Sequence, residues 1–225
     1  MTPSPNRPMM SSLENPRRIV VAKGVAGSAG YGEAAERLIA PYEEIAFEDV
    51  HAHVLHLLPA RPGCVLDIGA GTGRDAARFA EMGHRVVAVE PTDALREAAI
   101  RLHPSPAIDW VDDGLPGLAQ VVARNERFDL VMLTAVWMHL DAAERRTGMP
   151  VLAGLLRRGG VMIMSLRHGP VPEGRRMFEV TADETVALAA ADGLRPMLRR
   201  QSESLQAANR RAGVTWTHLA FERPD

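Results

Sequence analysis

The chain has 225 residues, of which 46% are hydrophobic and 24% are charged, as in ordinary soluble globular proteins. Its formal net charge is only −2, so we expect no general attraction to nucleic acid or to a membrane surface. No apolar run approaches the roughly 20 residues that cross a bilayer. The single cysteine, Cys64, has no partner for an internal disulfide, which fits a reducing cytoplasm. These properties predict a cytoplasmic protein, monomeric or homodimeric, that binds neither nucleic acid nor a membrane.

The N-terminal part of the chain differs from the rest. Residues 1–25 are predicted to form a flexible tail, because the first 16 contain four prolines and show no hydrophobic periodicity. Arg17 and Arg18 precede only four apolar residues, too few for a twin-arginine export signal. The remainder is predicted to be a single domain, with a helical cap at 26–60 and an α/β core at 61–225.

Strand-like and helix-like segments alternate along the core, with glycines and prolines marking the turns between them. The cap shows helical spacing at 33–39 and 45–58. Strands are predicted from short apolar runs at 64–68, 85–89, 108–111, 128–133 and 161–166, and strand-like stretches follow at 194–202 and 214–221. Helices are predicted at 75–82, 94–102, 118–125, 142–156 and 182–191.

This alternation predicts the fold class. Five strand-then-helix units followed by a C-terminal antiparallel pair indicate a doubly wound, mostly parallel seven-stranded α/β sheet with helices on both faces. Sheets of this kind bind ligands at the carboxyl ends of their strands. The residues that directly follow each predicted strand are therefore the first candidates for a site.

A glycine-rich loop follows the first predicted strand. Gly69, Gly71 and Gly73 would let the chain turn tightly and bring backbone N–H groups close to a ligand. A dinucleotide fingerprint needs glycine at the sixth position of such a loop, but that position is Arg74, which disfavours a nicotinamide-dependent oxidoreductase. Asp67, just before the loop, would repel a pyrophosphate and attract an ammonium group.

The segment from Asp67 to Gly73 resembles the first motif of class I S-adenosylmethionine-dependent methyltransferases. The resemblance implies their Rossmann-like fold, S-adenosylmethionine as cofactor and S-adenosylhomocysteine as product. It extends in architecture over residues 30–221 and is specific at the first two motifs. The second of these places Glu90 at the end of the second predicted strand, 23 residues after Asp67, where it is implied to accept the ribose hydroxyls.

Further cofactor contacts follow from the same resemblance. Asp112 is implied to bind the adenine amino group, whereas the neighbouring Asp113 is alternatively a turn or capping residue. The backbone after the fourth predicted strand, at Thr134 and Ala135, is implied to line the cofactor. The remaining predicted cofactor-binding residues are Gly69, Ala70, Gly71, Gly73, Arg74, Pro91 and Gly114.

The candidate catalytic residues lie on either side of this motif. His139 follows the fourth predicted strand and suits a general base, although a histidine in an apolar segment can also be purely structural. Tyr31 belongs to an N-terminal segment similar to those that cover the cofactor in small-molecule methyltransferases, and Tyr42 is the less favoured alternative. Trp137 is predicted either to contact the acceptor or to pack in the core.

Basic residues follow the fifth predicted strand. Arg167, His168, Arg175 and Arg176 are predicted to bind the acceptor, and arginines there suit an anion such as a carboxylate. Pairing with nearby glutamates, or plain solvation, is the alternative. No Cys/His group has the spacing of a zinc site, so no metal is predicted.

Together these observations predict an enzyme that transfers a methyl group from S-adenosylmethionine to a small-molecule acceptor. A chain without a basic face and without an appended domain favours a small acceptor. The alternatives are a methyltransferase that acts on a protein or RNA, and a non-catalytic protein that only binds S-adenosylmethionine.

Overall fold

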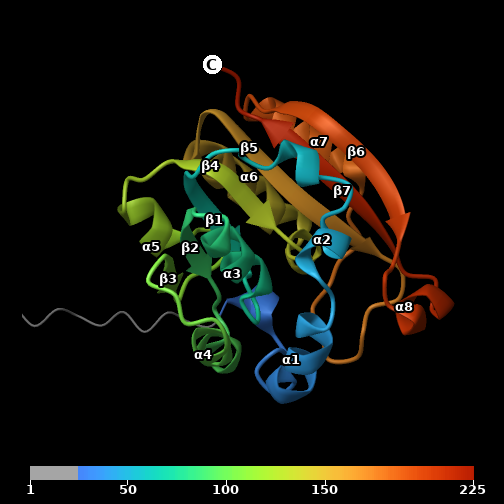
Figure 1. Ribbon diagram of the computed structural model, residues 1–225. Helices are drawn as coiled ribbons and strands as arrows, with labels where there is room; N and C mark the ends of the chain where they lie inside the picture. Colours follow the sequence, from blue (N-terminus) through green and yellow to red (C-terminus); the bar gives the residue numbers. More distant parts are fainter. Residues whose placement is uncertain (1–24) are drawn as a thin grey trace, which may run out of the picture.

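The computed structural model describes residues 25–225 (Figure 1). The predicted tail, apart from its last residue, and the Arg17-Arg18 pair lie outside the described residues. Within residues 25–225, no helix combines the length and the apolar character that crossing a membrane would require.

The cap contains a helix that overlaps the one predicted at 33–39, but the segment predicted as a helix at 45–58 forms only short turns of helix. A 3₁₀ turn at Ala26–Ser28 precedes α1 (Ala35–Glu43), and α2 (Phe47–Val50) is followed by a second 3₁₀ turn at Leu55–Leu57. The predicted helix at 45–58 is therefore wrong beyond its first turn. The N–H groups of Val54 and Leu57 bond to carbonyls three residues back, in tight turns that still bury Phe47 and Val54.

Seven strands form one sheet in the order β3-β2-β1-β4-β5-β7-β6. The first five are parallel, and β7 runs antiparallel to both β5 and β6. The strands are β1 (Cys64–Ile68), β2 (Arg85–Val89), β3 (Ile108–Val111), β4 (Phe128–Leu133), β5 (Leu156–His168), β6 (Arg195–Glu203) and β7 (Thr215–Glu222). The predicted fold class, with its mostly parallel sheet and antiparallel C-terminal pair, is confirmed.

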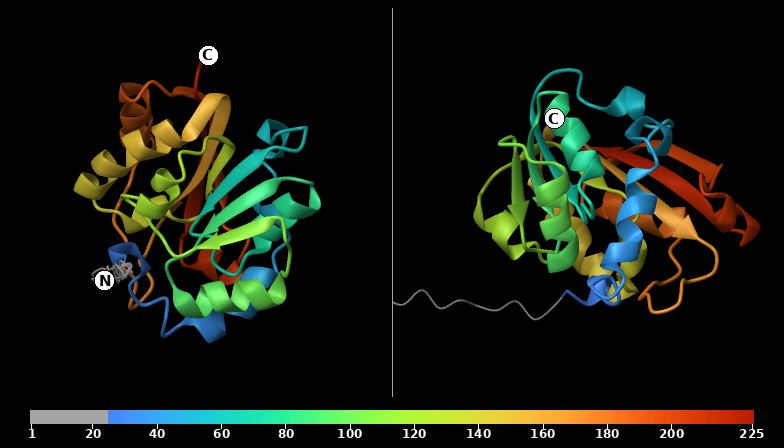
Figure 2. Two further views of the ribbon diagram at one scale, coloured as in Figure 1. Left: turned by 90° about the vertical axis from the view of Figure 1, so that its left-hand side faces the viewer. Right: turned by 60° about the horizontal axis from the view of Figure 1, so that its bottom comes forward.

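Helices cover both faces of the sheet (Figures 1 and 2). They are α3 (Arg74–Glu81), α4 (Asp93–Leu102), α5 (Ala119–Ala123), α6 (Ala142–Leu155), α7 (Ala182–Ala191) and the short α8 (Ala207–Arg211), which lies between β6 and β7. The predicted boundary of the fifth strand is wrong, because β5 begins at Leu156, directly after α6. The glycines at 159 and 160 lie inside this strand, beside an irregularity in its pairing with β4.

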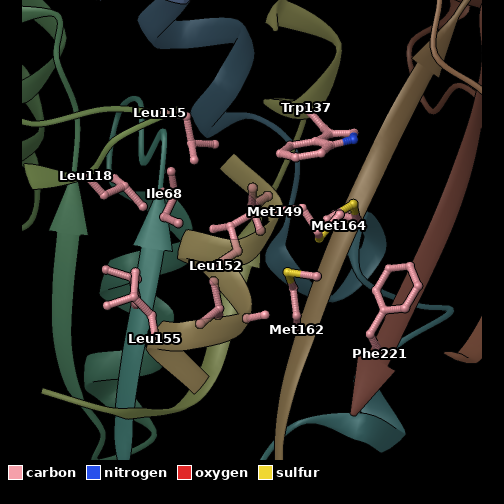
Figure 3. Close-up of a cluster of buried hydrophobic side chains, with 14 of the residues drawn as sticks. Ile68, Leu115, Leu118, Trp137, Met149, Leu152, Leu155, Met162, Met164 and Phe221 are labelled. Carbon is pink, nitrogen blue, oxygen red and sulfur yellow. The ribbon is translucent and has the colours of Figure 1, made fainter. Parts of the chain in front are cut away.

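The core has one cluster on each face of the sheet. Along β1, Leu66 and Ile68 belong to one cluster and Val65 to the other, as alternation in a strand requires. Figure 3 shows the larger cluster, in which α6 packs its buried side chains against β5. Helices cover both faces of the central strands. A ligand can therefore reach this part of the sheet only at the ends of the strands.

Candidate active site

A cavity of about 670 Å³ lies where the carboxyl ends of the parallel strands meet the cap. Its walls include the glycine loop after β1, the residues that follow β2 and β4, and the later part of β5. The cap closes it with Tyr31 and Tyr42, and β7 contributes Trp216 and His218. Ligand sites of small molecules have volumes of this order, about 300 to 1,000 Å³.

The glycine loop has the backbone shape that its sequence predicts. Gly69, Gly71 and Gly73 have φ angles of +69°, +58° and +90°, in the left-handed region that favours glycine. A Cβ on Gly69 would lie 2.5 Å from a methyl carbon of Val136, so the loop can approach the end of β4 only without a side chain there. Gly69 and Gly71 line the cavity, whereas Gly73 faces away from it, against Trp110 on β3.

Glu90 is buried at the end of β2, with 5% of its surface exposed. Its Oε2 accepts a hydrogen bond from the Gly71 N–H at 2.9 Å, and its Oε1 accepts one from the Thr92 N–H at 2.8 Å. Burial raises the pKa of Glu90. These two bonds fix the carboxylate against the glycine loop and leave each oxygen a second lone pair for a ligand donor.

Asp67 and Asp75 are both buried in the same wall of the cavity. Asp75 accepts hydrogen bonds from His51 Nε2 at 2.8 Å, Thr134 Oγ1 at 2.9 Å and Arg74 Nε at 2.8 Å. Burial opposes ionisation of Asp75, but His51 and Arg74 overcome it and hold the pKa of Asp75 well below its usual range. Asp75 is therefore a charged carboxylate that is fully paired within the protein.

Asp67, by contrast, has an unused oxygen. It is 1% exposed, and its Oδ2 has no hydrogen-bond partner among residues 25–225. Burial first, and then the charge of Asp75, raise the pKa of Asp67. An unpaired buried carboxyl is costly unless a ligand supplies a donor, so this atom fits the ammonium group that the sequence predicts for the ligand.

Tyr31, His139 and Arg175 form one cluster that also lines the cavity. The Tyr31 hydroxyl lies 3.0 Å from His139 Nε2, and His139 Nδ1 lies 2.7 Å from the backbone carbonyl oxygen of Arg176. Since a carbonyl only accepts, Nδ1 carries the proton and Nε2 accepts from the tyrosine. The Arg175 guanidinium stacks on the Tyr31 ring, 3.6 Å from its centroid, and its buried Nη1 has no partner among residues 25–225.

Burial and neighbouring charge decide how this cluster ionises. Burial is the main cause that raises the pKa of Tyr31. Burial also lowers the pKa of His139, and the guanidinium groups of Arg175 and Arg176 lower it further. The pair is therefore a neutral tyrosine bonded to a neutral imidazole.

Most of the other predicted residues also line the cavity. Asp113 lines it while its carboxylate accepts hydrogen bonds from the N–H groups of Gly114, Gln120 and Val121, which cap the start of α5. This matches the alternative, capping role predicted for Asp113. The remaining predicted residues that line the cavity are Ala70, Arg74, Pro91, Gly114, Thr134, Ala135 and Arg167.

The structure places four further predicted residues outside the cavity. Trp137 is fully buried in the core, among the side chains of Figure 3. Asp112 is exposed and lies 3.5 Å from Arg96 Nη1. His168 bonds to Thr217 Oγ1 at 2.8 Å, and Arg176 bonds to Glu144 at 2.7 Å. Each of these side chains is committed to the protein itself or to solvent instead of facing the cavity.

Several cavity residues were not predicted as site residues, and they share one property. They come from segments whose sequence shows only apolar periodicity or strand-like character. The sequence therefore gave no signal for them: Asp75, His53, Ser165, Trp216 and His218. Within residues 25–225 no group of three or more His, Cys, Asp or Glu side chains is arranged to hold a metal ion.

Comparison with known protein families places this site in context. A family model described as a methyltransferase domain matches residues 65–160, the segment that contains the glycine loop and Glu90. Glycine N-methyltransferase of Mus musculus is 27% identical over 208 residues, which cover 80% of this chain and 71% of the mouse protein. An uncharacterized methyltransferase of Mycobacterium bovis is 33% identical over 105 residues, and the match covers 46% of this chain and 40% of that protein.

Solved structures show the same fold. The 1,6-didemethyltoxoflavin-N1-methyltransferase of Burkholderia thailandensis, with bound 1,6-didemethyltoxoflavin and S-adenosylhomocysteine, superposes with a TM-score of 0.64 at 23% identity. That match covers 86% of this chain and 85% of the other. The N-methyltransferase NodS of Bradyrhizobium japonicum, in complex with S-adenosylhomocysteine, gives a TM-score of 0.66 at 18% identity, over 86% of this chain and 98% of the other.

Proposed function

Since the chain belongs to the class I S-adenosylmethionine-dependent methyltransferases, we propose that it methylates a small-molecule acceptor bound inside the 670 Å³ cavity. One observation carries the proposal. The residues suited to the cofactor, Glu90 and Asp67, line the same cavity as residues of the cap, β5 and β7. An acceptor in that space would be held beside the cofactor and away from bulk water.

S-adenosylmethionine is the cofactor of this family, and the residues present fit it. Bound there, it supplies a methyl carbon on a positively charged sulfur that is already activated toward a nucleophile. Glu90 would accept hydrogen bonds from the ribose hydroxyls through its free lone pairs. Asp67 would take the ammonium group at its unpaired Oδ2, and the loop from Gly69 to Gly71 would cradle the part between them.

The chain's own contribution to methyl transfer is then positioning and exclusion of water. Tyr31 and Tyr42 from the cap cover the cavity, and the hydrogen bond from Tyr31 to His139 ties the cap to the end of β4. Because that bond occupies His139 Nε2, we assign His139 and Tyr31 a role in closing and shaping the site.

An anionic group on the acceptor is favoured by the arginines that line the cavity. Arg175 is held flat against the Tyr31 ring and has a buried Nη1 without a partner among residues 25–225. Arg167 lines the same cavity. A carboxylate is the complement that guanidinium groups bind best in such a position.

The rival functions fit the cavity less well. A methyltransferase that acts on RNA or protein needs a surface for its partner, whereas this chain has a formal net charge of −2 and its candidate site is a cavity of about 670 Å³. A protein that only binds the cofactor would not need an enclosed acceptor space. The single cysteine favours a reducing compartment, so we place the activity in the cytoplasm.

The proposal is tested by methyl transfer from isotope-labelled S-adenosylmethionine into cell extract separated by size. We expect the label in the low-mass fraction, and its amount to depend on active protein. The Glu90→Ala variant is the matched control, because it should lose the cofactor without losing the fold. Label confined to protein or RNA would contradict a small-molecule acceptor. Absence of label from every fraction would contradict the proposal that the protein transfers methyl groups.

A further inference from the structure

Methylation of an N–H or O–H acceptor releases a proton, and the residue predicted from the sequence to take it is not available. His139 donates from Nδ1 to a backbone carbonyl and accepts from Tyr31 at Nε2, so neither nitrogen faces a ligand. Gaining a proton would also place a positive charge beside Arg175 and Arg176. An acceptor that loses its proton inside the cavity would therefore need another group to take it.

His53 has the properties that His139 lacks. It lies in the turn that follows α2, lines the cavity and is half-buried. Among the hydrogen bonds of residues 25–225, none involves its ring. Its one aromatic contact is with His218, whose ring centroid lies 5.1 Å away at an interplanar angle of 63°. An imidazole with free nitrogens inside a binding cavity can serve as a general base.

Strand pairing places His53 beside the strand ends of the site. His218 on β7 lies directly opposite Ser165 on β5, and residues paired in this way share one face of the sheet. Ser165 Oγ accepts a hydrogen bond from the N–H of Ala135, just after β4, at 2.9 Å. The contacts from His53 through His218 and Ser165 thus lead to the end of β4, which lines the cavity with Thr134 and Ala135.

We infer that His53 is the proton acceptor for the nucleophile that is methylated in this cavity. The inference rests on the proposed function. As the nucleophile's electron pair forms the new bond to the methyl carbon, the carbon–sulfur bond breaks and its electrons stay on sulfur. The proton of the nucleophile moves to a ring nitrogen of His53, which later returns it to water.

The charged groups around His53 are compatible with a transient imidazolium. On its own segment lie Asp49, which also lines the cavity, and His51, which is bonded to Asp75. From β6 and β7 come Glu203 and His218. Burial lowers the pKa of His218 to about 4, with His53 and His51 adding to the effect, so His218 stays neutral near pH 7. The cations that line the same cavity are Arg167 on β5, Arg74 at the start of α3 and Arg175 in the loop after β5.

The first test compares His53→Gln with a matched control, His56→Gln, which alters an exposed histidine of the same segment that does not line the cavity. The assay is labelled methyl transfer from S-adenosylmethionine into the low-mass extract fraction across pH 6 to 9. We expect His53→Gln to slow transfer about 100-fold at neutral pH and to remove the acid limb of the pH profile. S-adenosylhomocysteine affinity and Tm should stay unchanged, and added imidazole should restore part of the rate in His53→Ala.

The second test needs no acceptor and no bound cofactor. Diethyl pyrocarbonate acylates accessible, unprotonated imidazole nitrogens, and mass spectrometry locates each modified residue. His53 should react faster than His139 and His218, which are nearly buried and hydrogen-bonded. A reactivity of His53 no higher than theirs would overturn the inference.

The outcomes separate the two proposals. Suppose that wild-type protein transfers label. If His53→Gln then transfers it equally fast, or loses activity with an unchanged pH profile and without rescue by imidazole in His53→Ala, only the proposed role of His53 is refuted. If wild-type protein transfers no label, the proposed function and the role of His53 fall together.

Discussion

At the residue scale, the site contains two buried carboxyl groups that differ in their hydrogen bonding. Asp75 is surrounded by His51, Arg74 and Thr134, whereas Asp67 keeps an oxygen without a partner among residues 25–225. A protein that needed only stability would not leave Asp67 in this state. The arrangement is explained if the missing donor belongs to the ligand.

This contrast predicts how Asp67→Asn changes stability with pH. The pKa of Asp67 is raised in the folded protein, so the folded state binds that proton more tightly than the unfolded chain does. The free energy of unfolding therefore falls as pH rises above the ordinary aspartate pKa, about 3.9, and keeps falling until the raised pKa is passed. Asparagine carries no charge to bury, so Asp67→Asn should have a higher Tm than wild type at pH 8.

Thermal unfolding at pH 8 and pH 4, with calorimetry of S-adenosylhomocysteine, checks this prediction. The gain in Tm should vanish near pH 4, and the variant should bind S-adenosylhomocysteine more weakly. Asp75→Asn is the contrasting variant, because the pKa of Asp75 is lowered and its charge stabilises the fold at neutral pH. A loss of Tm at pH 8 in both variants would contradict the distinction drawn between the two carboxyls.

Glu90 gives a second prediction at this scale. Removing its carboxylate should weaken S-adenosylhomocysteine binding at least tenfold, about 1.4 kcal/mol, because two ribose hydroxyls lose their acceptor. Glu97→Ala, on the exposed side of α4, is the matched control and should bind normally. Equal affinities of the two variants would show that Glu90 does not hold the ribose.

The sequence predicted the positions of some individual site residues better than those of others. Asp67, Glu90 and the glycines belong to short local motifs, and the structure places all but Gly73 at the cavity. Trp137 was predicted either to contact the acceptor or to pack in the core, and Asp112 was implied as an adenine contact by the family resemblance. Whether such a side chain points to the core, to solvent or to the cavity depends on packing that a local motif does not encode.

At the element scale, the segment 25–34, here called the N-terminal strap, packs against the loop that follows β5. Gly30 has a φ of +78°, and a Cβ there would lie 2.1 Å from the carbonyl oxygen of Gly174. The strap can therefore reach the loop only at a residue without a side chain. This contact holds Tyr31 where its hydroxyl meets His139 and its ring meets Arg175.

Gly30→Ala should therefore loosen the strap. We expect faster hydrogen exchange over residues 25–34 and weaker binding of S-adenosylhomocysteine, with little change in exchange of the sheet. Gly32→Ala is the matched control, because a Cβ there meets nothing within 4 Å. Similar exchange in both variants would mean that the contact with Gly174 does not position the strap.

The strands of the core were predictable where they are short runs of buried apolar residues. The strands β1, β2 and β4 are short, largely buried apolar runs, and their predicted bounds agree with the structure, as do those of the edge strand β3. The cap was less predictable, since its apolar spacing at 45–58 is equally satisfied by short turns that bury Phe47 and Val54. Its shape depends on long-range contacts, such as the hydrogen bond from His51 to Asp75.

At the scale of the whole molecule, one end of the sheet collects residues that are far apart in the chain. The strap, the turn after α2, the end of β4, the loop after β5 and strand β7 all contribute to one cavity. Alternation of strands and helices predicted the sheet and the end at which the cavity lies. It could not predict the wall that the cap and β7 form together, because that wall exists only where these two elements meet.

The central claim is that this cavity holds S-adenosylmethionine and its product, and calorimetry with S-adenosylhomocysteine tests it most directly. We predict binding to a single site with an affinity well tighter than about 1 mM, abolished or strongly weakened by Glu90→Ala and unaffected by Glu97→Ala. Absence of S-adenosylhomocysteine binding to the wild-type protein, with a nicotinamide cofactor binding in its place, would contradict the account.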